Sequence, residues 1–319
     1  MLVYLGFERP AEGTQHIVVR QTCIDSRQAT AESLFVALKG ERTDGHAYVA
    51  NAFSAGASLA LVERPIAGYA MLDATRQSAP EPLSPPLTVL VPNTLAALQR
   101  IAHGRRAARP DLRVAAVTGS VGKTTTKEIV AAVLAQRYRV LKSAGNLNNE
   151  IGLPLTLLSL EAEHQCAVLE MGMYDLGEIA ALCRIAEPQI GVVTNVGPTH
   201  LERLGTIERI AQAKAELAQS LPDDGVAVLN GDDARVRAMQ RQTRARVVTY
   251  GLFDDNTVYA DDIVTEGLDG VRFTARVNLS AGFAVEAVSP PLRLRMLGQH
   301  AIWAALPAIA VGLVEGLSW

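Results

Sequence analysis

The sequence predicts an α/β protein, with a small N-terminal α/β domain followed by a central domain whose mainly parallel sheet is flanked by helices. Three observations predict this class. Short runs rich in Val, Ile or Leu alternate with longer stretches of helical spacing, a glycine-rich turn joins one such run to a helix, and a proline-rich stretch separates two parts of the chain.

The first part of the chain predicts the small domain, over residues 1–85. Compact apolar runs occur in TCIDSRQATAESLFVALKG and in ASLALVERP, and the segment between them, HAYVANAFSAGA, has helical spacing. Five of the 15 prolines then lie between Gln77 and Pro92, where they disfavour a helix and suit a connection that enters a strand. We therefore place the domain boundary near Pro85.

The second part, residues 86–319, predicts the larger domain. Its strand-like runs are LTVLVP, VAAVTG, RVLKSAG, CAVLEMG, IGVVTNVG and GVAVLNGDD. Helix-like stretches such as NTLAALQRIAHGRRAA lie between them, and this alternation indicates βαβ units that bind ligands at the carboxyl ends of the strands. Alternating residues such as VRFTARVNL, between Asn256 and Leu297, indicate an antiparallel extension. The final segment, HAIWAALPAIAVGLVEGLSW, predicts an apolar helix that Pro307 kinks or divides.

The composition limits the classes of partner. A net charge of -3 and a pI near 6.1 provide no general attraction to nucleic acids or anionic membranes. The chain has no apolar run long enough to cross a membrane and no basic start of the kind that precedes a signal sequence. Its three cysteines have no CxxC spacing, which fits a reducing compartment. We expect a cytoplasmic monomer with no nucleic-acid or membrane partner.

The stretch VAAVTGSVGKTTTKE at 114–128 places a buried strand, a glycine turn and a helix in succession. Backbone N–H groups and the positive end of a helix dipole bind anions at such a turn. Lys123 adds a cation for the β- and γ-phosphates, and the Thr124 hydroxyl suits Mg²⁺. Val117 stands where the common P-loop pattern has its first glycine, so the loop is shorter and begins at Gly119. The stretch predicts a P-loop-type triphosphate site, with a purely structural turn as the alternative.

Several stretches of the sequence resemble the Mur ligases. Those outside the phosphate loop are residues 25–57, GNLNNEIGLPLTLL at 145–158, VLEMGM at 168–173 and residues 194–217, so that the resemblance covers nearly all of the chain. It implies ATP and Mg²⁺ as cofactors. The residues that it assigns to nucleotide binding are Gly119, Ser120, Val121, Gly122, Lys123, Thr124, Thr125, Asn148, Asn149 and His300.

Glu170 ends an apolar run, where a carboxylate is costly unless it holds a cation or hydrogen-bond donors. Beside a phosphate site it predicts a Mg²⁺ ligand. By themselves, His200 and Lys214 predict a structural histidine and a surface lysine. The resemblance instead makes His200 a ligand of a second Mg²⁺ and implies that CO₂ carbamylates Lys214, which converts a cation that repels the metal into an anion that attracts it. The implied catalytic residues are Lys123, Glu170, His200 and Lys214, and the implied metal ligands are Thr124, Glu170, His200 and Lys214.

The resemblance also implies where the substrate binds. Polar residues of the N-terminal domain would hold the UDP end of the substrate, and they are Ser26, Arg27, Lys39, Asp44 and His46. Asn195 and Thr199 would position the substrate carboxylate. The sequence departs from the family at GQHAIWAALPA, where the family pattern has two asparagines that help to recognise adenine. Ala301 and Ala304 replace both, and adenine recognition is expected to be weaker, carried by backbone groups or less selective.

The implied reaction joins D-Ala-D-Ala to UDP-MurNAc-tripeptide through an acyl phosphate, at the expense of ATP, in peptidoglycan precursor synthesis. The family has a third, C-terminal domain and nothing follows Trp319, so we expect a partial protein that binds nucleotide but ligates poorly. The DSR and NLNNEIGLP stretches favour the branch that adds a dipeptide. Two alternatives stay open: another Mur-type or folylpolyglutamate-type ligase, and a non-catalytic nucleotide-binding module.

Overall fold

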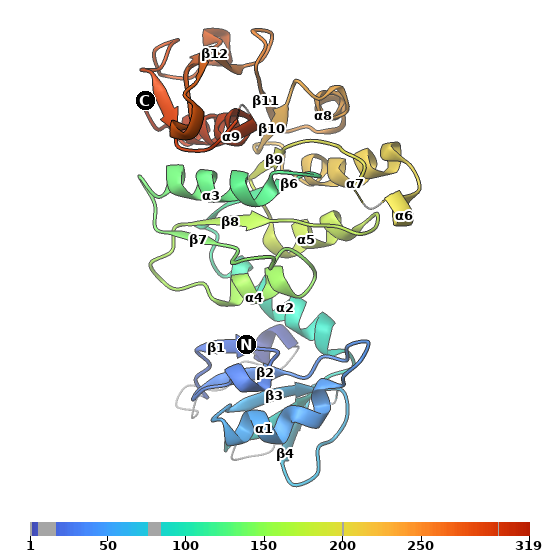
Figure 1. Cartoon of the computed structure of the whole chain (residues 1–319). Coiled ribbons are helices and arrows are strands. Elements are labelled where there is room, and N and C mark those ends of the chain that lie inside the picture. Colours follow the sequence, from blue (N-terminus) through green and yellow to red (C-terminus); the bar gives the residue numbers. More distant parts are fainter. Residues whose placement is uncertain (1, 6–16, 76–83, 200, 299) are drawn as a thin grey trace. The chain divides into compact units, whose positions relative to one another are not determined.

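The computed structural model describes residues 2–5, 17–75, 84–199, 201–298 and 300–319 (Figure 1). The chain forms two compact units, one of Met1–Pro110 with Glu150–Leu160 and one of Asp111–Asn149 with Glu161–Trp319. Each unit has its own sheet, covered by helices. The predicted α/β class with mainly parallel sheets is confirmed.

The first unit is built on a five-stranded parallel sheet in the order β1-β2-β3-β5-β4. The strands are β1 Gln21–Cys23, β2 Ser33–Val36, β3 Leu59–Val62, β4 Ala70–Asp73 and β5 Leu87–Leu90. Because successive side chains of a strand point to opposite faces, Leu34 and Leu61 join one hydrophobic cluster while Phe35 and Ala60 join another. The sheet is therefore buried on both faces, as parallel sheets usually are.

Helices cover both faces of this first sheet. α1 (Val49–Ser54) packs on the cluster around Phe35, whereas α2 (Thr94–Ala107) belongs to the cluster around Leu34. α4 (Gly152–Leu158) packs against α2. The 3-10 helices of this unit are η1 Leu2–Leu5, η2 Ser26–Gln28 and η3 Gly45–Tyr48.

The first unit extends past the boundary expected near Pro85. β5 pairs with β3 and β4, and α2 shares a hydrophobic cluster with the same sheet, so both elements belong to the first unit. The proline-rich stretch therefore connects β4 to β5 within one unit. Its composition indicates a connection, but it carries no information about which sheet the following strand joins.

The second unit is built on a nine-stranded sheet in the order β14-β13-β12-β11-β10-β9-β6-β8-β7. The parallel strands are β6 Arg113–Thr118, β7 Val140–Lys142, β8 Cys166–Glu170, β9 Ile190–Val193, β10 Val226–Asn230, β11 Arg246–Gly251 and β12 Val258–Thr265. β13 (Val271–Val277) and β14 (Leu292–Leu294) continue the sheet in antiparallel pairing, which confirms the predicted extension. β6 lies between β8 and β9, so the loops after these three strands meet at one edge.

Two pairs of helices cover the second sheet. α3 (Lys123–Leu134) and α9 (His300–Val314) pack against each other and share one core with the sheet. α5 (Glu178–Ala186) packs against α7 (Ile207–Gln219), which contacts β6 and β9. The shorter helices are α6 Leu201–Leu204, α8 Ala234–Ala238, η4 Met239–Gln242, η5 Gly267–Asp269 and η6 Leu279–Ala281.

The C-terminal helix α9 continues through Pro307, so the proline does not divide it, which was one of the two effects expected from the sequence. Proline removes one helical hydrogen bond, which normally interrupts a helix. Here the neighbouring residues Leu306 and Ala308 are fully buried, and the contacts with α3 and the sheet hold the helix on both sides of the proline. Within the described ranges, no helix has both the length and the apolar character that crossing a bilayer requires.

Candidate active site

The phosphate loop connects the carboxyl end of β6 to the first turn of α3. Gly119 and Gly122 have φ angles of 149° and 83°, in the region that favours glycine. A Cβ at position 119 would lie 1.9 Å from Thr194 Oγ1, so this loop needs its first glycine where it packs against the loop after β9. Gly122 is the N-cap of α3 and provides no side chain to cap it, which leaves the helix N-terminus suited to an anion.

Lys123 is the cation of this loop. Its Nζ donates to the carbonyl oxygens of Gly119, at 3.0 Å, and Ser120, at 3.3 Å. The ammonium group therefore lies across the loop in which a phosphate would sit. Burial lowers the pKa of Lys123, and the negative charge of Glu170 acts in the opposite direction.

Glu170 ends β8 beside the phosphate loop, and its side chain is almost fully buried at 2% exposure. Oε2 accepts from Thr124 Oγ1 at 2.9 Å, and Oε1 accepts from Asn148 Nδ2 at 2.8 Å. Both donors are neutral, so they leave the negative charge of the carboxylate for a cation to balance. A carboxylate and a hydroxyl are hard oxygen ligands of the kind that Mg²⁺ prefers, so the pair of Thr124 and Glu170 fits this ion.

The loop after β9 braces the phosphate loop through a set of hydrogen bonds. Asn195 forms two of them with the backbone of Val121, through its Oδ1 and Nδ2 at 2.9 Å each. Thr199 Oγ1 donates to Ser120 Oγ at 3.1 Å, and Ser120 Oγ accepts from the backbone N–H of Gly197 at 2.8 Å. Asn195 and Thr199, which we expected to hold the substrate carboxylate, thus have partners within the protein.

Lys214 lies on α7 and is 3% exposed. Burial, and then the positive charge of Lys123, lower its pKa to about 7. The prediction of a solvated surface lysine is therefore wrong, and a large share of the side chain is a neutral amine near neutral pH. His200 lies outside the described residues. Among the described residues, no cluster of three or more His, Cys, Asp or Glu side chains could hold a metal ion.

Polar residues at the end of β10 (Val226–Asn230) and just after it also support the site, and sequence reasoning missed them. Asn230 Nδ2 donates to the carbonyl of Thr194 at 2.7 Å, and Asp233 accepts from the N–H of Val196 at 2.8 Å. Asp232 accepts from Trp303 Nε1 at 2.8 Å, which connects α9 to the end of β10. The sequence feature that could have identified these residues is NGDD, at the end of the run GVAVLNGDD. Polar residues at the carboxyl end of a parallel strand lie at the sheet edge that binds ligands.

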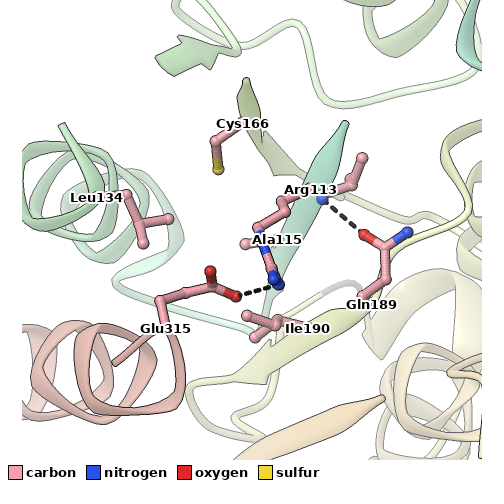
Figure 2. Close-up of a pocket in the computed structure, with 8 residues that line it drawn as sticks. Arg113, Ala115, Leu134, Cys166, Gln189, Ile190 and Glu315 are labelled. Carbon is pink, nitrogen blue, oxygen red and sulfur yellow. Dashed lines mark hydrogen bonds and ion pairs between the residues drawn. The ribbon is translucent and has the colours of Figure 1, made fainter. Parts of the chain in front are cut away.

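Figure 2 shows a different hollow of the second unit, at the amino-terminal ends of its strands. It has a volume of about 10 Å³ and an adjoining hollow has about 280 Å³. Arg113 forms an ion pair with Glu315 at 3.0 Å, and the Gln189 side chain accepts from the N–H of Val114 at 2.7 Å. The smaller cavity has room for about one water molecule. This cavity lies at the opposite edge of the sheet from the phosphate loop. The ion pair between Arg113 and Glu315 beside it links the start of β6 to the residue that follows α9.

Known protein families match both units of the chain. Residues 117–312 match the family described as Mur ligase middle domain, and residues 18–106 match the Mur ligase family, catalytic domain. The chain belongs to the Mur ligase family. The resemblance that its motifs indicated is thus confirmed.

Several Mur ligases are similar over nearly all of this chain. The UDP-N-acetylmuramoyl-tripeptide--D-alanyl-D-alanine ligase of Bacillus subtilis (strain 168) is 38% identical over 306 residues, 95% of this chain and 60% of that protein. MurF from Acinetobacter baumannii has a TM-score of 0.81 at 31% identity, with 94% of this chain and 60% of that chain covered. MurF ligase from Thermotoga maritima in complex with ADP has a TM-score of 0.79 at 27% identity, with 95% and 65% covered. The chain thus spans 60% of the length of the curated relative from Bacillus subtilis.

The candidate UDP-site residues of this Mur ligase lie in its first unit. Arg27 forks onto Asp25, whose pKa falls to about 2 because the side chain and backbone of Arg27 donate to it. The Arg27 side chain remains largely exposed, as does Lys39, whereas Ser26 is buried. Arg27 and Lys39 are therefore the members of the predicted set that present charge to the solvent.

Asp44 and His46 form a network of their own. His46 Nδ1 contacts Asp44 Oδ1 at 2.6 Å, and its Nε2 accepts from the N–H of Glu63 at 2.8 Å. Because Nε2 is the acceptor, Nδ1 carries the proton and donates to Asp44. Hydrogen bonds from His46 and Arg64 lower the pKa of Asp44. Both ring nitrogens of His46 thus have partners in the protein, so the ring supports the loop between Lys39 and Asp44.

The first residues of α9 include Ala301 and Ala304, which stand where the family pattern has asparagines. His300 is exposed at the start of the helix. Ala301 is fully buried and Ala304 is 7% exposed. Neither alanine has a polar side-chain atom, so neither can donate to or accept from a base.

Proposed function

We propose that this chain works in an ATP-dependent amide ligase that joins D-Ala-D-Ala to UDP-MurNAc-tripeptide through an acyl phosphate. The observation that carries the proposal is the meeting of Lys123, Thr124 and Glu170 at the carboxyl edge of the second sheet. The names of the relatives in Bacillus subtilis and other bacteria support the choice of substrates. These substrates also support a cytoplasmic location, because UDP-linked precursors are made from a cytoplasmic nucleotide.

The residues divide the work of phosphoryl transfer between charge neutralisation and alignment. Lys123 and the first N–H groups of α3 bind the β- and γ-phosphates of ATP. Thr124 and Glu170 would hold a Mg²⁺ ion, and His200 with Lys214 would hold a second one. A bound Mg²⁺ ion would neutralise charge on the γ-phosphoryl group, and this group would pass from ATP to the substrate carboxylate as ADP leaves. The amine of D-Ala-D-Ala attacks the resulting acyl phosphate, and phosphate leaves.

In this scheme Lys214 would carry a carbamate, whose negative charge would attract the second Mg²⁺ ion. Only a neutral amine reacts with CO₂, and the pKa of about 7 makes the neutral form abundant at neutral pH. The ammonium form would repel both Lys123 and a metal ion, whereas a carbamate would attract both.

The first unit would bind the UDP end of the substrate. Arg27 and Lys39 are the exposed cations that can meet a diphosphate, with Ser26 close to Arg27 in the 3-10 helix η2. Asp44 and His46 would act by holding the loop that carries Lys39.

The test is equilibrium binding of a fluorescent ATP analogue in the presence of Mg²⁺. The wild-type chain should bind the analogue, and Lys123→Met should weaken binding about 10-fold or more because it removes a charged contact to phosphate. Lys142→Met, at an exposed lysine of β7, should bind as the wild type does. Equal affinity of the Lys123→Met variant would contradict the proposal.

A further inference from the structure

Lys127 is a fully buried lysine for which the proposed mechanism has no use. It lies on α3 one turn beyond Thr124, with 0% exposure. Burying an ammonium group is costly unless it has partners, and apolar residues often replace buried ion pairs without loss of stability. The partners of Lys127 therefore indicate what it does.

The first partner is Ser143, the residue after β7. Lys127 Nζ donates to the carbonyl oxygen of Ser143 at 2.7 Å, and it forms an ion pair with Glu128 at 3.1 Å. Ser143 is itself fully buried, and its Oγ accepts from the backbone N–H of Glu170 at 3.2 Å. A continuous contact path thus runs from Lys127 through Ser143 to the backbone of Glu170.

The segment that begins at Ser143 holds Glu170 at a second point. Asn148 donates to the Glu170 carboxylate, and the Asn148 carbonyl accepts from the N–H of Gly172 at 2.8 Å. α3 also reaches Glu170 directly through Thr124. Lys127 and Thr124, on neighbouring turns of one helix, therefore fix the backbone and the carboxylate of Glu170 respectively.

We propose that Lys127 is a positioning residue for the metal site: through Ser143 it sets where the Glu170 carboxylate lies relative to Thr124. The proposal rests on the proposed function in so far as Glu170 and Thr124 hold Mg²⁺. A residue that positions a ligand in this way typically changes metal affinity 10- to 100-fold when it is replaced.

The first test uses Lys127→Met, which keeps the length of the side chain and removes its charge. The Mg²⁺ concentration at half-maximal binding of the fluorescent ATP analogue should rise about 10-fold, measured well below the melting temperature of the variant. Lys142→Met is the matched control, because Lys142 pairs with the same Glu128 from an exposed position and should leave the Mg²⁺ requirement unchanged. A purely structural role would lower the melting temperature of Lys127→Met without changing this requirement.

The second test uses neither metal nor nucleotide, so it evaluates Lys127 even if the proposed function fails. Hydrogen exchange at the amide of Glu170 should be faster in Lys127→Met and in Ser143→Ala than in the wild type, because each removes one link of the path. Should Lys127→Met fail to fold, Ser143→Ala decides through the same two measurements. Either an unchanged Mg²⁺ requirement in a folded variant that binds the analogue or an unchanged exchange rate at Glu170 would overturn the proposal.

Discussion

Gly119 shows how a single position shapes the phosphate loop. An alanine there would place its Cβ 1.9 Å from Thr194 Oγ1, so that the loop or the segment after β9 must move. Gly122 has open space around it and a left-handed backbone, so Gly122→Ala has only the conformational cost, about 1 to 2 kcal/mol. We expect Gly119→Ala to reduce the free energy of unfolding more than Gly122→Ala, as measured by urea denaturation. Equal losses would show that the contact with Thr194 is unimportant.

Lys214 should make stability depend on pH. Its pKa is about 7 in the folded protein and near 10.5 when unfolded, so between these values the unfolded state binds more protons. Stability contributed by this group therefore rises as the pH rises through that window and is lost as the pH falls toward 7. In CO₂-free buffer, the free energy of unfolding should increase less steeply with pH for Lys214→Met than for the wild type. Identical slopes would contradict the lowered pKa.

The same residue should form a carbamate. At a fixed concentration of dissolved CO₂, labelled with ¹³C, the carbamate signal in the NMR spectrum should increase as the pH rises through about 7, because the neutral amine becomes more abundant. Lys214→Arg should abolish the signal. A signal that persists in this variant would assign carbamylation to another lysine.

The sequence predicted some residues of the site better than others. Strand and helix patterns placed Thr124 and Glu170 at one sheet edge, and the structure joins them by a hydrogen bond. The partners of Asn195 and the burial of Lys127 could not be predicted in this way. Both depend on which loop passes beside which helix, and local spacing does not specify that arrangement.

At the scale of elements, Glu216 connects the two helices α5 and α7. Its Oε1 accepts from the N–H of Gly177 at 2.6 Å and its Oε2 from that of Ala180 at 3.0 Å, so a carboxylate of α7 caps the N-terminus of α5. Glu216→Gln should lower the free energy of unfolding by about 1 to 2 kcal/mol, because the amide keeps only one acceptor. The control is Glu208→Gln on the exposed face of α7, which should change it by less than about 0.5 kcal/mol. Similar effects of the two substitutions in urea denaturation would contradict this capping role.

Element patterns predicted most strands and helices but not all of their partners. The periods of the apolar residues identified the strands on either side of the phosphate loop and the antiparallel pairing after Asn256. They did not show that β5 belongs to the first sheet, because a short apolar strand with three of its four residues buried fits either sheet. The tendency of proline to interrupt a helix also did not predict that α9 is one helix through Pro307, because packing against α3 and the sheet holds it together.

At the scale of the whole molecule, the two units share the chain in an interleaved way. The second unit begins at Asp111, yet Glu150–Leu160 returns to the first unit and contributes α4. The segment from Ser143 to Asn148, which holds Glu170, directly precedes this return. A single boundary drawn from composition could not describe such a division, because long-range packing alone determines it.

The most direct measurement is a crystal structure of the chain with Mg²⁺ and a nonhydrolysable ATP analogue. The triphosphate should lie across the loop from Gly119 to Thr124, with Mg²⁺ bound by the Thr124 hydroxyl and the Glu170 carboxylate. An ordered analogue bound elsewhere, with the loop after β6 unoccupied, would contradict the proposed function.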